Sequence, residues 1–215
     1  MAFQTDLKAF CLDDLKEIIA EYYLIPSRIV LKERLEEILS AVKKEGIENL
    51  YDLKKTLNNK KLFQNFIRNT GLDEEFLKIL LREIKSYEVK KISIDKLEFL
   101  TETEIKVFQQ IGIKTNQQLW DYLKIKEQDI PGISFERQIE IFLLTDILRI
   151  NGVGIVFAEM LIEIGLTSPG KIYDFSEEEL LKFWSEYQSK NQLQTALGKN
   201  DISWLKKYCY LLRKR

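Results

Sequence analysis

The chain has 215 residues, of which 45% are hydrophobic and 31% charged, and its formal net charge is −1. This composition is that of a folded globular protein, and it excludes both a disordered chain and one that is basic over its whole surface. The sequence contains no histidine, which excludes Ser–His–Asp and Cys–His catalytic systems and histidine metal ligands.

Nothing in the sequence resembles a targeting or membrane-spanning segment. Residues 1–8 lack the basic and apolar regions of a secretory signal, and the most apolar stretch, 139–157, contains Glu140, Asp146 and Arg149. Cys11 and Cys209 are too far apart for a metal or redox motif, and each fits an apolar helical stripe. We therefore expect two buried free thiols, a cytoplasmic protein and no membrane partner.

Apolar residues recur with the period of a helix, in chain order, over residues 7–22, 31–42 and 76–87. Helix-start signals follow: capping boxes at 101–104, 115–118 and 176–179, and a cap followed by proline at Ser168–Pro169. No segment alternates as a strand does. The sequence predicts an all-α fold of serial helix–turn–helix hairpins.

One frame recurs around glycine. Gly46, Gly112 and Gly165 each have an apolar residue four before, directly after and seven after, and Gly71 fits except at the last place. A helix commonly ends on a left-handed glycine, and the next apolar residue then folds back onto it. The frame predicts repeated helical hairpins. Pro131 and Gly132, in the seam 128–134, suggest an N-terminal domain over 1–130 and a C-terminal domain over 131–215, or one core shared by both halves.

Residues 148–162 carry the most specific pattern, with Gly152, Val153 and Gly154 followed by Ala158 four places later. This segment resembles the helix-hairpin-helix motif, in which the glycines allow a tight turn and the small residue lets two helices approach. The resemblance implies that backbone amides at the second helix hold a nucleic-acid phosphate without reading sequence. We therefore predict a nucleic-acid contact made by Arg149, Asn151, Gly152, Val153, Gly154 and Lys171.

The same segment departs from the nucleic-acid-binding pattern, because Ile155, Val156 and Phe157 stand where such proteins often carry polar or basic residues. Two interpretations follow: a weak, sequence-independent contact with DNA or RNA phosphates, or a purely structural hairpin in a protein-interaction adaptor. Aligning Gly165 with Gly112 places Gly152 on Phe99 and Gly154 on Thr101, so the earlier copy lacks both hairpin glycines.

Over roughly residues 24–175 the order of these motifs resembles an uncharacterised prokaryotic family, domain of unknown function 4332. The matching stretches are 24–28, 71–78, 82–87, 112–115 and the Gly152 hairpin. The resemblance implies a helical fold and a binding role, and it brings no known reaction or cofactor.

We expect no enzyme activity, no cofactor and no metal site. Adjacent carboxylates such as Asp13–Asp14 and 73–75 fit helix starts better than a catalytic pair. The basic and aromatic run 60–68 is interpreted as core at Phe63 and Phe66, with single-strand binding as the alternative. The basic residues of 199–215 are expected to form either a solvated helix end or a nucleic-acid surface.

Overall fold

The chain folds into helices joined by turns and loops. The computed structural model describes residues 2–125 and 130–214. Helices take up 68% of these residues and no strand forms among them, which confirms the predicted all-α class. Within the same ranges, no helix combines the length and the apolar character that a membrane crossing requires.

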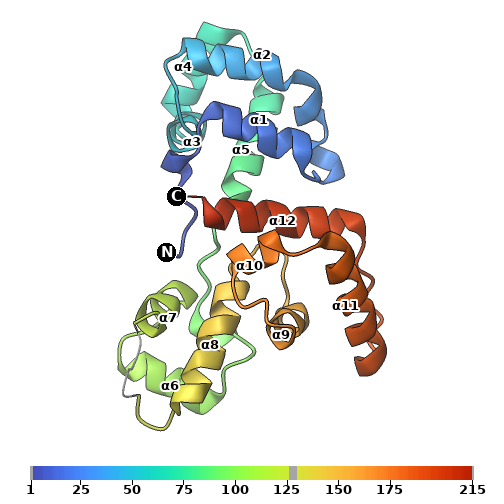
Figure 1. Cartoon of the computed structure of the whole chain (residues 1–215). Helices are drawn as coiled ribbons and strands as arrows, with labels where there is room; N and C mark the ends of the chain where they lie inside the picture. Colours follow the sequence, from blue (N-terminus) through green and yellow to red (C-terminus); the bar gives the residue numbers. More distant parts are fainter. Residues whose placement is uncertain (1, 126–129, 215) are drawn as a thin grey trace.

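Figure 1 shows α1–α5 on one side of the last helix, α12, and α6–α11 on the other. The α-helices of the described residues are α1 (Leu12–Glu21), α2 (Val30–Lys44), α3 (Leu50–Asn58), α4 (Lys60–Thr70), α5 (Glu74–Ser86), α6 (Glu102–Gln110), α7 (Asn116–Leu123), α8 (Phe135–Ile147), α9 (Ile155–Glu163), α10 (Pro169–Asp174), α11 (Glu177–Asn191) and α12 (Lys199–Arg213). Short 3-10 helices form at Leu7–Ala9, Pro26–Arg28 and Ile94–Lys96.

The predicted glycine frame is a repeated helix ending. Gly46, Gly112 and Gly165 all have positive φ, and in each case the following amide donates to the carbonyl five residues earlier. This is the pattern of a Schellman ending, and a new helix is capped three residues after each glycine. The capping residues are Asn49, Thr115 and Ser168, and the apolar residues at the seventh position, Leu53, Leu119 and Ile172, are fully buried.

Gly71 also has positive φ, but its helix α5 is capped by Asp73, only two residues later. This shorter turn explains why the frame fails at its last place.

Thr101 and Glu104 form the predicted capping box, and Ser168 caps α10 with Pro169 at the first position. Phe63 and Phe66 are buried, as expected for core residues.

The apolar side chains form two clusters. The larger one joins α1–α5 to residues from the end of α8 to α12, and the smaller one gathers residues between 94 and 141. Helix α8 contributes to both, with Ile141 in the smaller cluster and Ile147 in the larger. Ile130 and Ile133 flank the predicted boundary at 130/131 and belong to the same cluster, so the two clusters do not meet there. Residues 126–129, where the predicted seam begins, lie outside the described residues.

Helix α12 corrects the expectation of a solvated basic end. Lys207 is completely buried, and its Nζ lies 3.0 Å from Oε1 of Glu83, which is also fully buried. Nη1 of Arg28 lies 2.6 Å from the other carboxylate oxygen of Glu83. Lys206 is 7% exposed, and its ammonium donates to the carbonyls of Ile172, at 3.0 Å, and Tyr173, at 2.6 Å.

Two further cations of the tail are paired, whereas Lys199, at the start of α12, is exposed. Arg213 pairs with Asp174 at 2.5 Å, and Lys214 pairs with Asp14. Cys209 is buried on this helix, and burial raises the pKa of its thiol. Cys11 is exposed, contrary to expectation, because it precedes α1 as its N-cap and lies off the buried face of that helix.

We predict that Lys207→Met lowers the free energy of unfolding by about 3 kcal/mol, because removing one partner of a buried pair leaves a poorly compensated charge. Methionine keeps the length of the side chain, so the loss reports on the charge. Lys190→Met is the control, since Lys190 is exposed in its pair with Glu163 and exposed pairs contribute about 0–1 kcal/mol. Urea denaturation measures both. A loss below about 1 kcal/mol would contradict the importance of this pair.

Glu104 of α6 and Arg137 of α8 form an ion pair. Hydrogen bonding to Arg137, with Nε at 2.7 Å, lowers the pKa of Glu104 below its ordinary value of 4.5. A depressed carboxyl pKa stabilises the fold above the unfolded value and loses this contribution as pH falls through the folded pKa. Glu104→Gln should therefore cost roughly 1–2 kcal/mol at neutral pH, and the difference should shrink below about pH 4.5.

Glutamine at position 104 can still cap α6, so the variant isolates the charge. Glu140→Gln is the matched control, because Glu140 pairs with the same Arg137 but is 56% exposed. Thermal unfolding between about pH 3 and 7 distinguishes them. An undiminished difference at low pH would show that the loss at position 104 is not electrostatic.

Candidate binding site at the turn between α8 and α9

The turn between α8 and α9 is short and closed by one backbone bond. The amide of Val153 donates to the carbonyl of Ile150 at 3.1 Å, and Gly154 then caps α9 without a side-chain bond. Ala158 is fully buried in α9, as expected for a close helix contact. Two other turns share this closure, ending on the caps Thr101 of α6 and Ser134 of α8. The predicted alignment of Gly154 with Thr101 is therefore a structural equivalence as well.

The two glycines of the turn have different roles. Gly152 has φ +92°, a conformation that other residues rarely adopt, and a Cβ there would lie 3.0 Å from Nε1 of Trp204. Gly154 has φ −92° and ψ 168°, which is ordinary extended backbone, and a Cβ there would meet no atom within 4 Å. The turn requires glycine at position 152 only.

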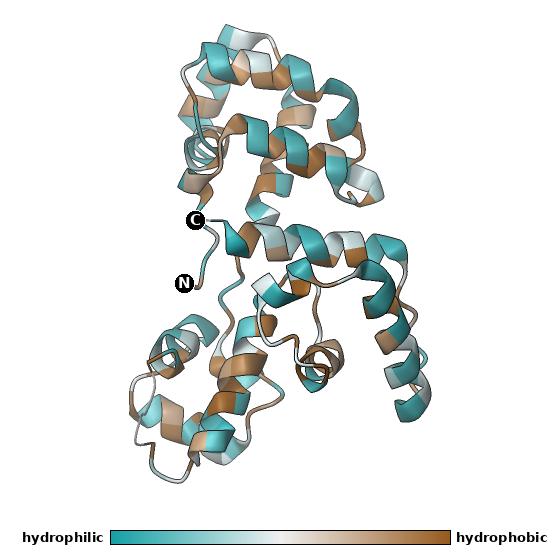
Figure 2. Cartoon of the chain, viewed as in Figure 1, coloured by the Kyte–Doolittle hydropathy of each residue, from teal (hydrophilic) through white to brown (hydrophobic). Residues whose placement is uncertain are grey.

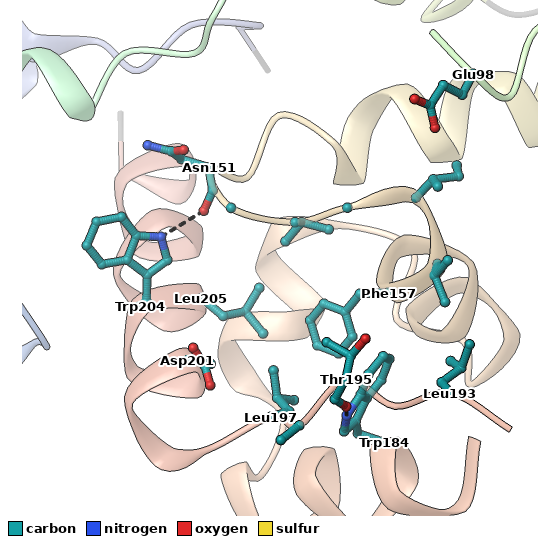
Figure 3. Close-up of a pocket in the computed structure, with 16 residues that line it drawn as sticks. Glu98, Asn151, Phe157, Trp184, Leu193, Thr195, Leu197, Asp201, Trp204 and Leu205 are labelled. Atoms are coloured by element: carbon teal, nitrogen blue, oxygen red, sulfur yellow. Dashed lines mark hydrogen bonds between the residues drawn. The ribbon is translucent and has the colours of Figure 1, made fainter. Parts of the chain in front are cut away.

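Trp204 of α12 lies against this turn. Its indole Nε1 donates to the carbonyl of Asn151 at 3.0 Å, as the dashed line in Figure 3 marks. The side-chain amide of Asn151 reaches the carbonyl of Ser86 at 3.4 Å. The turn is thus fastened to α12 on one side and to the end of α5 on the other.

Arg149 does not lie beside the turn as a free cation. It is 4% exposed, Nη2 lies 2.5 Å from Oδ1 of Asp146, and Nη1 donates to the carbonyls of Ala2 and Phe3. Its guanidinium also lies over the ring of Trp120, 4.8 Å from the centroid. This corrects its expected placement against a phosphate, because its donors already hold the N-terminal segment and a carboxylate.

Lys171 is exposed, and its ammonium bonds within its own turn, to Oγ1 of Thr167 at 3.1 Å and to the carbonyl of Gly165 at 3.4 Å. Lys171 also lies outside the hollow that opens beside the 150–154 turn. Of the six predicted contact residues, the structure brings Asn151, Gly152, Val153 and Gly154 together at the turn. Arg149 lies next to them but is buried in an ion pair, and Lys171 lies outside the hollow.

A hollow of about 550 Å³ opens beside the turn, and we name it the hairpin cleft. Figure 3 shows residues of α9, α11, α12 and the loop 193–197 around it. Its wall is mostly apolar, and the rings of Phe157 and Trp184 meet edge to face with their centroids 5.2 Å apart. The indole of Trp184 donates to the carbonyl of Thr195 at 3.2 Å, which ties the loop to α11.

The charged side chains that line the hairpin cleft in the described residues are carboxylates, Glu98 and Asp201, and no Lys or Arg lines it. Two smaller hollows, of about 190 and 150 Å³, adjoin it, and Val153 lines all three. Lys96 lines only the first of these, and Lys90 and Arg149 only the second. The described residues contain no group of three or more His, Cys, Asp or Glu that could hold a metal ion.

Sequence reasoning missed Trp184, Trp204 and the loop 193–197 as parts of this site. The available signal was the apolar content of that loop, where Leu193, Ala196 and Leu197 stand between two helices. Ile155–Phe157 were noted as unusual for a nucleic-acid contact, and all three line the hairpin cleft.

Comparison with protein-family models, curated proteins and solved structures gave no match for this chain. The resemblance to domain of unknown function 4332 stays a prediction.

We predict that Gly152→Ala and Gly154→Ser change stability in opposite directions. Alanine at position 152 meets both the positive φ and the ring of Trp204, which together should cost roughly 1–3 kcal/mol. Serine at position 154 should add a side-chain cap, like that of Ser134, and raise stability by a few tenths of a kcal/mol or about 1 kcal/mol at most. Urea denaturation of the two variants checks this. Equal losses at both positions would contradict the assignment of the turn's conformational demand to Gly152.

Proposed function

We propose that this chain is a non-enzymatic binding module that holds an apolar segment of another protein in the hairpin cleft. The observation that carries the proposal is the wall of the cleft, which presents aromatic and aliphatic side chains beside a backbone turn. Val156 on this wall is 39% exposed although it is apolar. Apolar surface gathered around a concave site favours a partner that removes it from water.

The charges of the site favour a protein partner over nucleic acid. Phosphate binding draws its affinity from cations. Of the two cations expected at the turn, Arg149 is buried, and Lys171 is exposed but does not line the cleft. Arg149 pairs with Asp146, and Lys207 with Glu83. The carboxylates of Glu98 and Asp201, which line the cleft, would repel a phosphate backbone.

The shape of the site favours a long protein segment, which could be helical, over a small compact ligand. The hairpin cleft shares Glu98, Val153 and Ile155 with one neighbouring hollow and Asn151, Gly152 and Val153 with the other. The hollows therefore continue along both sides of the turn. A protein segment can cover such a surface with successive side chains, as helices do when they lie in apolar grooves.

Phosphate contact through the amides of the α8–α9 turn stays a prediction, as do the helix-hairpin-helix assignment and a cytoplasmic location. Nucleic-acid binding by this route would be weak and would fall with salt, with a log–log slope of roughly −0.9 per phosphate.

We predict that peptides of about 16 residues, selected from a random displayed library on the immobilised full chain, bind at the hairpin cleft. Val156→Gln should weaken the selected peptides about tenfold, because an amide would be buried in the interface without a partner. The matched control is Ile139→Gln, since Ile139 of α8 is also exposed, at 44%, and lies outside the described hollows. Fluorescence anisotropy measures the affinities, and circular dichroism checks that each variant is folded.

Equal effects of the two substitutions, or no selected binders, would contradict the proposal. A labelled DNA duplex provides the competing test. Binding at ~50 mM salt that disappears at ~200 mM and is unaffected by Val156→Gln would favour the nucleic-acid alternative instead.

A further inference from the structure

Two carboxylates lie at the edges of the hairpin cleft, from elements far apart in the sequence. Glu98 belongs to the turn that precedes α6, and Asp201 to the first turn of α12. Figure 3 shows Asp201 to the left of Phe157 and Trp184 and Glu98 at the upper right of the view, so the two carboxylates lie at separate edges of the cleft. Both residues are exposed, so their charges face water in the free protein.

Neither carboxylate forms an ion pair within the described residues. Asp201 accepts the amide of Gly198 at 2.8 Å in the capping of α12, where the helix dipole favours a negative charge, but no Lys or Arg of the described residues pairs with it. Elsewhere in the fold carboxylates that lie against packed surfaces are paired, as Glu83 is with Lys207 and Glu104 with Arg137. Unpaired charge of one sign around an apolar centre is complementary to a partner of the opposite sign.

From this arrangement we infer that the segment held in the hairpin cleft is basic at both ends. Apolar side chains fill the centre, a Lys or Arg on one side pairs with Glu98, and a second cation on the other side pairs with Asp201. This inference rests on the proposed function and adds the chemistry of the partner. The two cations fix the direction and the position of the segment in the cleft, because apolar contacts alone specify neither closely.

The experiment uses the tightest selected peptide that has a cation on each side of its apolar residues, and the same peptide with both cations changed to Gln. Affinities are measured at ~100 mM salt for the wild-type chain, Glu98→Gln and Asp201→Asn. Asparagine can still accept the Gly198 amide, so the start of α12 is kept. Glu48→Gln is the control, because Glu48 is exposed and lies in the loop before α3, outside the described hollows.

We expect the basic peptide to bind the wild-type chain several-fold more tightly than its Gln version. Glu98→Gln and Asp201→Asn should each weaken the basic peptide by about two- to fivefold, the range of exposed ion pairs. Neither should change the affinity of the Gln peptide, and Glu48→Gln should leave both peptides unchanged. The double-mutant cycle between peptide and protein isolates each pair from other effects.

The inference and the proposed function fail in different ways. If selected peptides lose affinity with Val156→Gln but show no enrichment of flanking cations, the basic partner is wrong and the cleft remains a binding site. The same holds if the preference for the basic peptide survives both carboxylate substitutions. If Val156→Gln affects no selected peptide, the proposed function fails and the inference fails with it.

Discussion

Glu83 of α5 and Lys207 of α12 are both fully excluded from solvent, and their charged atoms lie 3.0 Å apart. An unpaired charge in such a place would cost several kcal/mol, so α12 is stable against α5 only where this ammonium meets this carboxylate. Arg28 completes the pair from a third element, the 3-10 helix before α2, at 2.6 Å from Glu83. Apolar packing of helices tolerates shifts of position, whereas a buried ion pair penalises them. The arrangement of the α1–α5 group relative to the C-terminal helices therefore depends on this contact.

The hairpin cleft depends on the same helix position. Trp204 lies three residues before Lys207 on α12, its ring lies 4.1 Å from the Lys207 ammonium, and its indole holds the Asn151 carbonyl. A shift of α12 that broke the buried pair would also move one wall of the cleft away from the α8–α9 turn. Gly152 makes the approach possible, because any Cβ at that position would lie against the indole. The stability of the core and the shape of the candidate site are thus coupled through the position of α12, which carries both Lys207 and Trp204.

The glycine endings of helices were predicted correctly from the sequence, whereas of the three predicted capping boxes only the one at 101–104 forms in full. Glycine at positions 46, 112 and 165 predicted left-handed helix endings, since φ and the closing bond involve only a few neighbouring residues. The sequence pattern assigned the same role in the tight turn to Gly152 and Gly154, although the structure requires glycine only at position 152. Gly152 alone has a positive φ, and it alone approaches Trp204, which the packing of α12 brings to the turn from a distant part of the chain.

The sequence by itself determined the all-α class, several helix starts and glycine endings, and the absence of histidine chemistry, because these follow from residue type, periodicity and short-range capping. Only the tertiary structure decided which charges are available to a partner. Arg149, Lys206 and Lys207 are basic in any reading of the sequence, yet all three are buried and bound to Asp146, helix-end carbonyls and Glu83. Glu98 and Asp201, which no local pattern distinguished, line the cleft and have no ion-pair partner in the part of the chain that the structure describes. The physical reason is that burial and pairing depend on residues distant in the chain, so the charge of a site is a property of the folded packing.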